Sequence, residues 1–273
     1  MSVELIALLA TLCVAGGIAG ITAGLFGNGG GFVVVPALLA VFGVFGQTTS
    51  DIMYVAVGTS LASIVVSSAR SVQAHARRGA VDFQVLKDWA GWLVLGALIG
   101  LYIASKVDGN SLVIVFATGV LAYSFYFLFP GVFGDGGITD TMPRGIGRAG
   151  LASFLGGFSA LLGIGGGTIT VMTMTLCSRP VHQAVATASG VGLIIGLSGA
   201  VGFLILGLGA ENLPYGSVGY INVPALIAIA AISIFTAPLG AKWAHSLNDL
   251  HLKRLFGVYL VIVSLSMYAK ALG

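Results

Sequence analysis

A glycine-rich cluster occurs twice in this chain, each time inside apolar sequence. Residues 24–31 read GLFGNGGG and residues 160–167 read ALLGIGGG, about half the chain length apart. A helix does not run comfortably through three successive glycines, because glycine loses more backbone entropy on ordering than any other residue. Each cluster is therefore predicted to interrupt a helix and to leave backbone N–H and C=O groups without helical partners.

The sequence around the clusters is that of an integral membrane protein. Of the 273 residues, 57% are hydrophobic and 8% are charged, whereas soluble domains carry about 25% charged residues. In hydrocarbon, an interrupted helix is tolerated only where protein or a water-filled cavity satisfies its backbone. Paired interruptions at matching places in two halves are typical of transporter binding sites. The net charge of +3 comes with no basic, aromatic-rich surface that would indicate nucleic-acid binding.

Ten apolar segments, five in each half, are predicted to form helices and give an all-α fold. Their approximate ranges are 3–26, 31–45, 52–72, 84–104, 111–129, 146–162, 168–178, 183–208, 221–241 and 254–270. A spanning helix needs about 20 residues, so the segments at 31–45 and 168–178 are too short for comfortable crossings. Each is expected to form one arm of a broken or re-entrant hairpin, which leaves about eight to ten true crossings. The first segment lacks the basic start of a signal peptide, and it is interpreted as the first helix.

The basic residues predict the orientation in the membrane. If every apolar segment reverses direction, the loops near 73–82 and 242–252 lie on the same side as the central linker. All but two of the 12 lysines and arginines belong to this side, the exceptions being Lys106 and Lys270. By the positive-inside rule this side is cytoplasmic, which places both termini outside.

The two halves resemble each other beyond the glycine clusters. The stretch AVGTS at 56–60 is similar to AVATA at 184–188, and GAVD at 79–82 is similar to GYIN at 219–222. An odd number of segments per half turns the second copy upside down, which predicts two inverted repeats with the glycine-broken or re-entrant helices at their interface. The predicted organisation is one membrane domain, with repeat 1 over 1–130, a linker over 131–145 and repeat 2 over 146–273.

An anion-binding site is predicted where the helices after the two clusters begin, near Gly31 and Gly167. Helix N-termini expose free N–H groups and a partial positive charge, so two that converge near the midplane bind an anion without lysine or arginine. Asn28 would add an amide donor and Thr168 a hydroxyl. The predicted substrate-binding residues are Asn28, Gly29, Gly30, Gly31, Thr59, Ser60, Gly165, Gly166, Gly167, Thr168, Thr187 and Ser189.

Structural alternatives exist for these residues. The glycines can serve only to let helices cross closely, and the hydroxyls can bond back to carbonyls of their own helices. The titratable side chains of both halves are expected near the membrane interfaces and not at the midplane; they are Asp51, His75, Asp82, His182 and Glu211. No Ser–His pair or metal-ligand cluster is convincingly placed, so the sequence predicts no enzyme, no metal site and no cofactor.

The duplicated glycine motif, the AVGTS stretch and the length of about 270 residues resemble the sulfite exporter TauE/SafE family, also called the toluene-sulfonate uptake permease family. The resemblance covers essentially the whole chain. It implies a multi-pass carrier of the bacterial inner membrane, here with periplasmic termini, for small and often sulfur-containing anions such as sulfite, sulfoacetate and related sulfonates. Members of the family more usually carry an aliphatic residue before the triple glycine, as Ile164 does here, and Asn28 departs from that pattern.

The favoured interpretation is a secondary transporter that moves a small anion by alternating access. Its partners would be the anionic substrate, the lipid bilayer and a coupling proton or sodium ion. A passive anion channel is the first alternative, and a membrane enzyme or a scaffold for another protein is the second. Saturable flux with counterflow is typical of the carrier, and flux at single-channel rates is typical of the channel.

Overall fold

The computed structural model describes residues 3–44, 51–133, 139–244 and 249–272. These residues contain ten α-helices, which confirms the helical membrane fold and all ten apolar segments. The helices are α1 (Val3–Phe26), α2 (Gly31–Val44), α3 (Ile52–Ala76), α4 (Phe83–Ala104), α5 (Gly109–Leu128), α6 (Gly145–Leu162), α7 (Gly167–Leu176), α8 (Val181–Leu206), α9 (Val223–Trp243) and α10 (Asp249–Leu272). A 3₁₀ turn, η1 (Pro130–Phe133), and a hairpin of two-residue strands, β1 (Ser217–Val218) and β2 (Ile221–Asn222), add small elements that the all-α prediction did not include.

Seven of the described helices are long and apolar enough to cross a bilayer: α1, α3, α4, α5, α6, α8 and α9. Helices α2 and α7 have only 14 and 10 residues, which at 1.5 Å per residue span about 21 and 15 Å. Both are the second arm of a glycine-broken pair, as the sequence predicts. Helix length and composition thus identify seven candidate crossings among the described residues, and the expected total of eight to ten stays a prediction.

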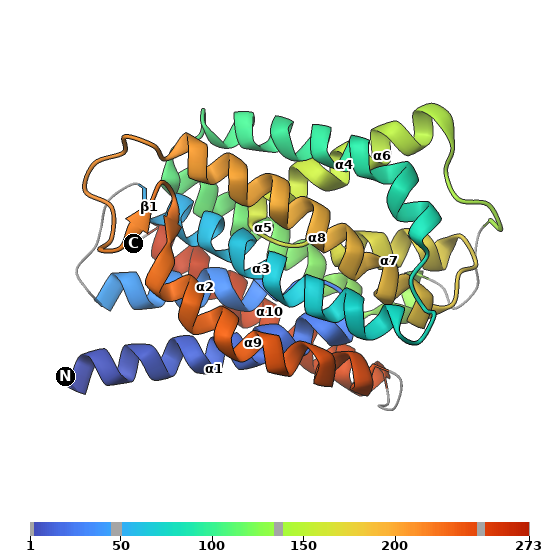
Figure 1. The fold of residues 1–273 in the computed structure, drawn as a ribbon, viewed down its shortest axis with the longest axis horizontal. Coiled ribbons are helices and arrows are strands. Elements are labelled where there is room, and N and C mark those ends of the chain that lie inside the picture. Colours follow the sequence, from blue (N-terminus) through green and yellow to red (C-terminus); the bar gives the residue numbers. More distant parts are fainter. Residues whose placement is uncertain (1–2, 45–50, 134–138, 245–248, 273) are drawn as a thin grey trace.

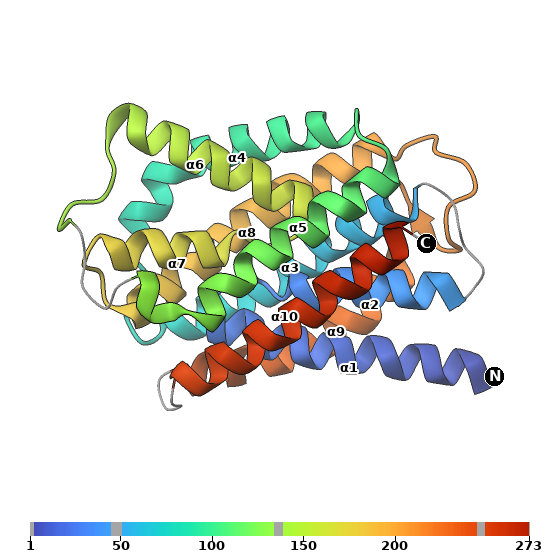
Figure 2. The same cartoon turned by 180° about the vertical axis from the view of Figure 1, so that it is seen from behind.

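The long helices pack as pairs along the bundle. Helix α1 lies against α9 and helix α4 lies against α6, at opposite edges of the view in Figure 1. Between these pairs α3 packs against α8, and α5 packs against α10 (Figure 2). Small residues bring the paired backbones close together, since a Cβ on Gly16 of α1 would lie 2.6 Å from the carbonyl oxygen of Ile229 in α9.

The connections between helices gather at two ends of the bundle. The start of α1, the end of α10 and the hairpin of β1 and β2 lie at one end in Figure 1. The turns from α3 to α4 and from α7 to α8 lie at the other end, and they carry Arg77, Arg78 and Arg179. Parts of three predicted connections, at 45–50, 134–138 and 245–248, fall outside the described residues, including the middle of the predicted linker.

Candidate functional site

Both glycine clusters interrupt their helices where the sequence predicts. In the first break Gly27, Gly29 and Gly30 have φ angles of +67°, +74° and +83°, and in the second break Gly163 and Gly166 have +65° and +66°. L side chains rarely adopt this left-handed region, because the Cβ crowds the following carbonyl. These five glycines are therefore required by the backbone conformation, in addition to any role in close packing.

The two breaks lie against each other in the interior of the bundle. The backbone N–H of Gly165 donates to the carbonyl oxygen of Asn28 over 3.1 Å. A Cβ on Gly31 would lie 2.9 Å from the Cα of Ile164, and a Cβ on Gly167 would lie 2.5 Å from the Cα of Asn28. All residues at 27–31 and 163–167 are buried. The starts of α2 and α7 therefore meet inside the protein.

Polar groups at this crossing are left with spare hydrogen-bonding capacity. The side-chain oxygen of Asn28 accepts from the N–H of Gly30 over 3.0 Å, while its Nδ2 has no partner among the described residues. The hydroxyl of Thr168 is 4% exposed and equally unpaired. A buried polar group without a partner costs about 1–3 kcal/mol. Such groups mark the place where a ligand or an ordered water completes the hydrogen bonding.

Three further buried hydroxyls near the crossing were missed by the sequence analysis. Ser159 of α6 comes within 3.0 Å of the position that a Cβ on Gly166 would take. Ser68 of α3 comes within 2.9 Å of the corresponding position on Gly192. The third hydroxyl belongs to Tyr123 of α5, and none of the three has a partner among the described residues. The position of Ser159, one helical turn before the second break, is a signal that could have found it.

Thr59 and Thr187 bind loops that belong to the opposite halves of the chain. Thr59 Oγ1 in α3 accepts from the backbone N–H of Asn222 over 2.8 Å. Thr187 Oγ1 in α8 accepts from the backbone N–H of Asp82 over 2.9 Å. Asn222 and Asp82 are in turn the side-chain caps of α9 and α4. Because each threonine acts as an acceptor in these bonds, its own O–H remains a donor.

Two serines of α3 hold the breaks in place, Ser60, which the sequence predicts for the site, and Ser67, which it does not. Ser60 Oγ donates to the carbonyl oxygen of Gly163 over 2.8 Å, and Ser67 Oγ donates to the carbonyl oxygen of Gly29 over 3.0 Å. Helix α3 is thus tied to both breaks at once. Ser189 bonds to a carbonyl of its own helix over 3.2 Å, as the structural alternative expected, and also pairs with a serine of α3.

A hollow lies beside the start of α7. Its walls include Phe26, Phe127, Thr168, Val171, Val181 and Val185, and it is small and partly open to the outside. Val181, at the first position of α8, is 45% exposed. The hollow therefore lies between the exposed first residue of α8 and the start of α7, with Thr168 in its mostly apolar lining.

The sequence of the chain matches the model of a known protein family. The family model described as "Sulfite exporter TauE/SafE" matches residues 12–267. The chain belongs to the TauE/SafE family. It is accordingly a multi-pass membrane transporter and not an enzyme.

Relatives of this TauE/SafE protein match it over nearly their full lengths. A probable membrane transporter protein of Haemophilus influenzae is 33% identical over 261 residues, which cover 93% of this chain and 96% of that protein. A probable membrane transporter protein of Methanocaldococcus jannaschii is 28% identical over 271 residues, 97% of each chain. The probable membrane transporter protein YunE of Bacillus subtilis is 27% identical over 278 residues, 92% of this chain and 94% of that protein. No solved structure matches.

One titratable side chain of the TauE/SafE protein is buried between two helices. His75 lies in the last turn of α3, but its side chain is 0% exposed. Its Nε2 is 3.1 Å from the carbonyl oxygen of Gly24 in α1. Helix α1 therefore covers this imidazole, at the end of α3 that leads into the loop with Arg77 and Arg78.

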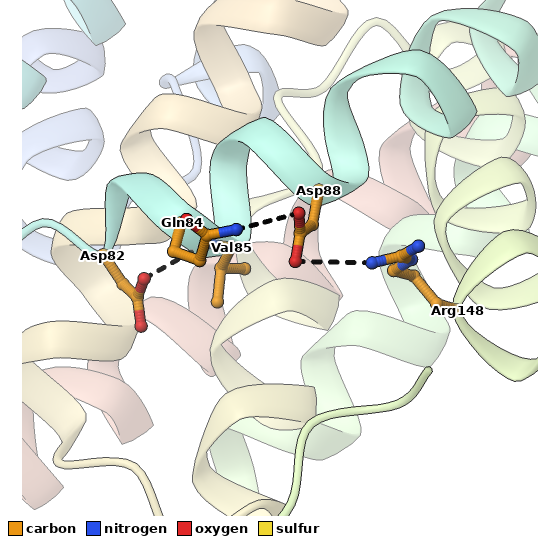
Figure 3. Close-up of polar contacts among 5 residues, drawn as sticks. All are labelled: Asp82, Gln84, Val85, Asp88 and Arg148. Carbon is orange, nitrogen blue, oxygen red and sulfur yellow. Dashed lines mark hydrogen bonds and ion pairs between the residues drawn. The ribbon is translucent and has the colours of Figure 1, made fainter. Parts of the chain in front are cut away.

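Charged side chains join α4 to α6 away from the crossing (Figure 3). Asp82 caps α4 by accepting from the N–H of Val85 over 3.1 Å. Asp88 accepts from Gln84 over 3.0 Å and pairs with Arg148 of α6 at 3.3 Å. The side chains of Arg148 and Asp88 are 28% and 41% exposed, and exposed pairs of this kind contribute about 0–1 kcal/mol. This pair is a helix contact and does not supply a charge to the crossing.

Proposed function

We propose that this TauE/SafE protein is a secondary transporter that moves a small anion across the bacterial inner membrane by alternating access. Sulfite, sulfoacetate or another organosulfonate is the substrate. The observation that carries the proposal is the crossing of the two glycine breaks, where two helix N-termini meet in a buried setting beside unpaired donors. Helix N-termini attract anions through their free N–H groups and their partial positive charge.

The predicted site residues act at this crossing in two ways. The backbone N–H groups of the segments 28–31 and 165–168 that are not already bonded, as those of Gly30 and Gly165 are, bind the anion directly, with the Asn28 amide and the Thr168 hydroxyl. Thr59 and Thr187 turn their O–H donors toward it, and Ser60 and Ser189 keep the surrounding helices in position. Hydrogen bonds to a charged partner contribute about 1.5–3 kcal/mol each, so a few of them suffice for a small ion.

The two halves act as inverted repeats, 1–130 and 146–273, joined by the linker 131–145. The threonine contacts support this proposal, because corresponding residues exchange partners: Thr59 of the first half binds Asn222 of the second, and Thr187 of the second binds Asp82 of the first. The helix pairs α1–α9 and α6–α4 correspond under the same exchange. An internal two-fold relation is what alternating access by two similar halves requires.

A difference between the two ends of the bundle supports alternating access. At the end with the hairpin, Tyr220, Ile221 and Asn222 are buried and close the bundle. At the other end Asp82 is partly exposed, and the hollow beside Thr168 opens there. We interpret this as a state that is less tightly closed on the side of the basic loops. By the positive-inside rule that side is cytoplasmic, with both termini periplasmic.

Flux through the purified protein in liposomes tests the proposal. We expect saturable uptake of radiolabelled sulfite or sulfoacetate, accelerated by unlabelled substrate on the opposite side. A pH gradient or a sodium gradient would drive accumulation, according to which ion is coupled. Rapid flux without saturation or counterflow would favour the passive anion channel instead. The absence of flux for all the sulfur oxyanions tested would overturn both the transporter and the passive anion channel.

A further inference from the structure

The two helix starts at the crossing are not equivalent. At the start of α2, the side-chain oxygen of Asn28 accepts a hydrogen bond from the Gly30 N–H over 3.0 Å. The protein thus supplies its own acceptor where an anion would sit. At the start of α7, the residue that corresponds to Asn28 is Ile164, which offers no side-chain acceptor for the N–H of Gly166. First-turn N–H groups have no partner within their own helix at either start, so the start of α7 is the more open of the two in its hydrogen bonding.

Two buried hydroxyls lie beside this open helix start. Ser159 is 0% exposed, and its Oγ lies 3.0 Å from the position of a Cβ on Gly166. Tyr123 is 6% exposed, and its ring packs at 6.3 Å from the ring of Phe158 and at 5.1 Å from that of Phe32. The Tyr123 hydroxyl approaches Ser159, yet neither makes a hydrogen bond of normal geometry with the described residues.

The same asymmetry is present in the sequence when the two clusters are aligned. Gly27 and Gly163 correspond, so Ser159 stands where the first copy has Ala23, and Thr168 stands where it has Phe32. Ala23 and Phe32 are 1% and 0% exposed. The second half therefore places two buried hydroxyls around its helix start, whereas the first half places hydrocarbon at the equivalent positions.

We infer that the substrate anion binds closer to the start of α7 than to that of α2, and that Tyr123 and Ser159 determine specificity by donating hydrogen bonds to it. This inference rests on the proposed function. The hydroxyls and backbone N–H groups act together as donors, and the group they recognise is one with several acceptor oxygens and no hydrogen to donate. A fully ionised oxyanion such as a sulfonate or sulfite group meets that requirement.

Calorimetric titration of the purified protein in nanodiscs with sulfite, and separately with sulfoacetate, tests the inference. Tyr123→Phe and Ser159→Ala each remove one hydroxyl and little volume. We expect the Kd to rise about tenfold in each, the scale of one charge-assisted hydrogen bond, with one anion bound per chain. The matched control is Ser124→Ala, which removes a neighbouring hydroxyl that is 1% exposed but bonds over 2.6 Å to a carbonyl of its own helix. It should leave the Kd unchanged.

A reciprocal variant covers the case in which Tyr123→Phe or Ser159→Ala fails to fold. Ala23→Ser puts a hydroxyl at the equivalent position near α2, and we expect no change in Kd, whereas a site shared evenly by both helix starts would bind more tightly. The inference would be overturned by tighter binding in Ala23→Ser or by a stoichiometry of two anions per chain. It would also be overturned if Tyr123→Phe and Ser159→Ala both kept the Kd of the unaltered protein. The proposed function fails by a different result, in which the unaltered protein neither binds nor transports sulfite or sulfoacetate.

Discussion

Replacement of Gly167 by alanine probes the crossing of the two breaks with a single methyl group. The new Cβ would meet only backbone atoms of the other break, including the carbonyl oxygen of Gly27 and, at 2.5 Å, the Cα of Asn28. Carbon atoms in contact lie about 3.5–4.0 Å apart, so the two breaks must separate by roughly an ångström. A side-chain end could rotate away at little cost, but these two backbone segments cannot.

The expected change in the free energy of unfolding of Gly167→Ala is the sum of two opposing contributions. Overpacking of a well-packed interior costs about 1–3 kcal/mol, and alanine recovers about 0.5–1 kcal/mol relative to glycine within a helix. We therefore expect the free energy of unfolding to fall by about 1–2 kcal/mol. Transport should fall more steeply, because the separation also displaces the N–H groups at the start of α7. Loss of one hydrogen bond to the anion, about 1.5–3 kcal/mol, corresponds to at least a tenfold lower rate at subsaturating substrate.

The measurements are the thermal unfolding of the detergent-purified protein and sulfite uptake into liposomes, normalised to the monodisperse protein recovered. Gly91→Ala is the matched control, since Gly91 is exposed on α4 and a Cβ there would meet nothing within 4 Å. It should keep both the Tm and the uptake of the unaltered protein. If Gly167→Ala also kept both, the breaks would not be in the tight contact described here, and the reasoning would be refuted.

Three further outcomes are expected. Thr187→Val and Thr59→Val each remove the acceptor for a loop N–H at 2.9 or 2.8 Å and should lower sulfite uptake about tenfold or more; unaltered uptake in both would remove the threonines from the mechanism. Arg148→Gln should change the free energy of unfolding by less than about 1 kcal/mol, because its ion pair is partly exposed, and a larger loss in thermal unfolding would contradict this. Lys106→Cys, in a variant without the native cysteines, should react with an impermeant thiol reagent from outside intact cells, and reaction only from the cytoplasm would reverse the proposed topology. Lys106 is preferred to Asp108 for this label because Asp108 caps α5 through the N–H of Ser111.

The helices and the positions of their interruptions could be read from the sequence. Apolar segments of about 20 residues form helices in a membrane, because only helices and closed barrels satisfy the backbone there and the strands of a barrel are much shorter. The breaks follow from glycine itself, and five glycines of the two clusters have positive φ angles. The correspondence of AVGT at 56–59 with AVAT at 184–187 also pointed to the two threonines that contact the loops. These are local properties, or repeats of local properties, and neighbouring residues suffice to determine them.

The partner of each polar side chain was decided only by the tertiary structure. Asn28 looked like a donor for the ligand, and the structure adds that its oxygen accepts from the N–H of Gly30 just before α2. The burial of His75 against α1 likewise has no signal in the sequence. Tyr123 and Ser159 belong to separate helices with no shared motif, and their hydroxyls come near each other because α5 and α6 pack beside the crossing. Sequence determines which groups a chain carries and where its backbone must break, whereas the partner of a buried hydroxyl depends on which distant segment the packing brings within about 3 Å.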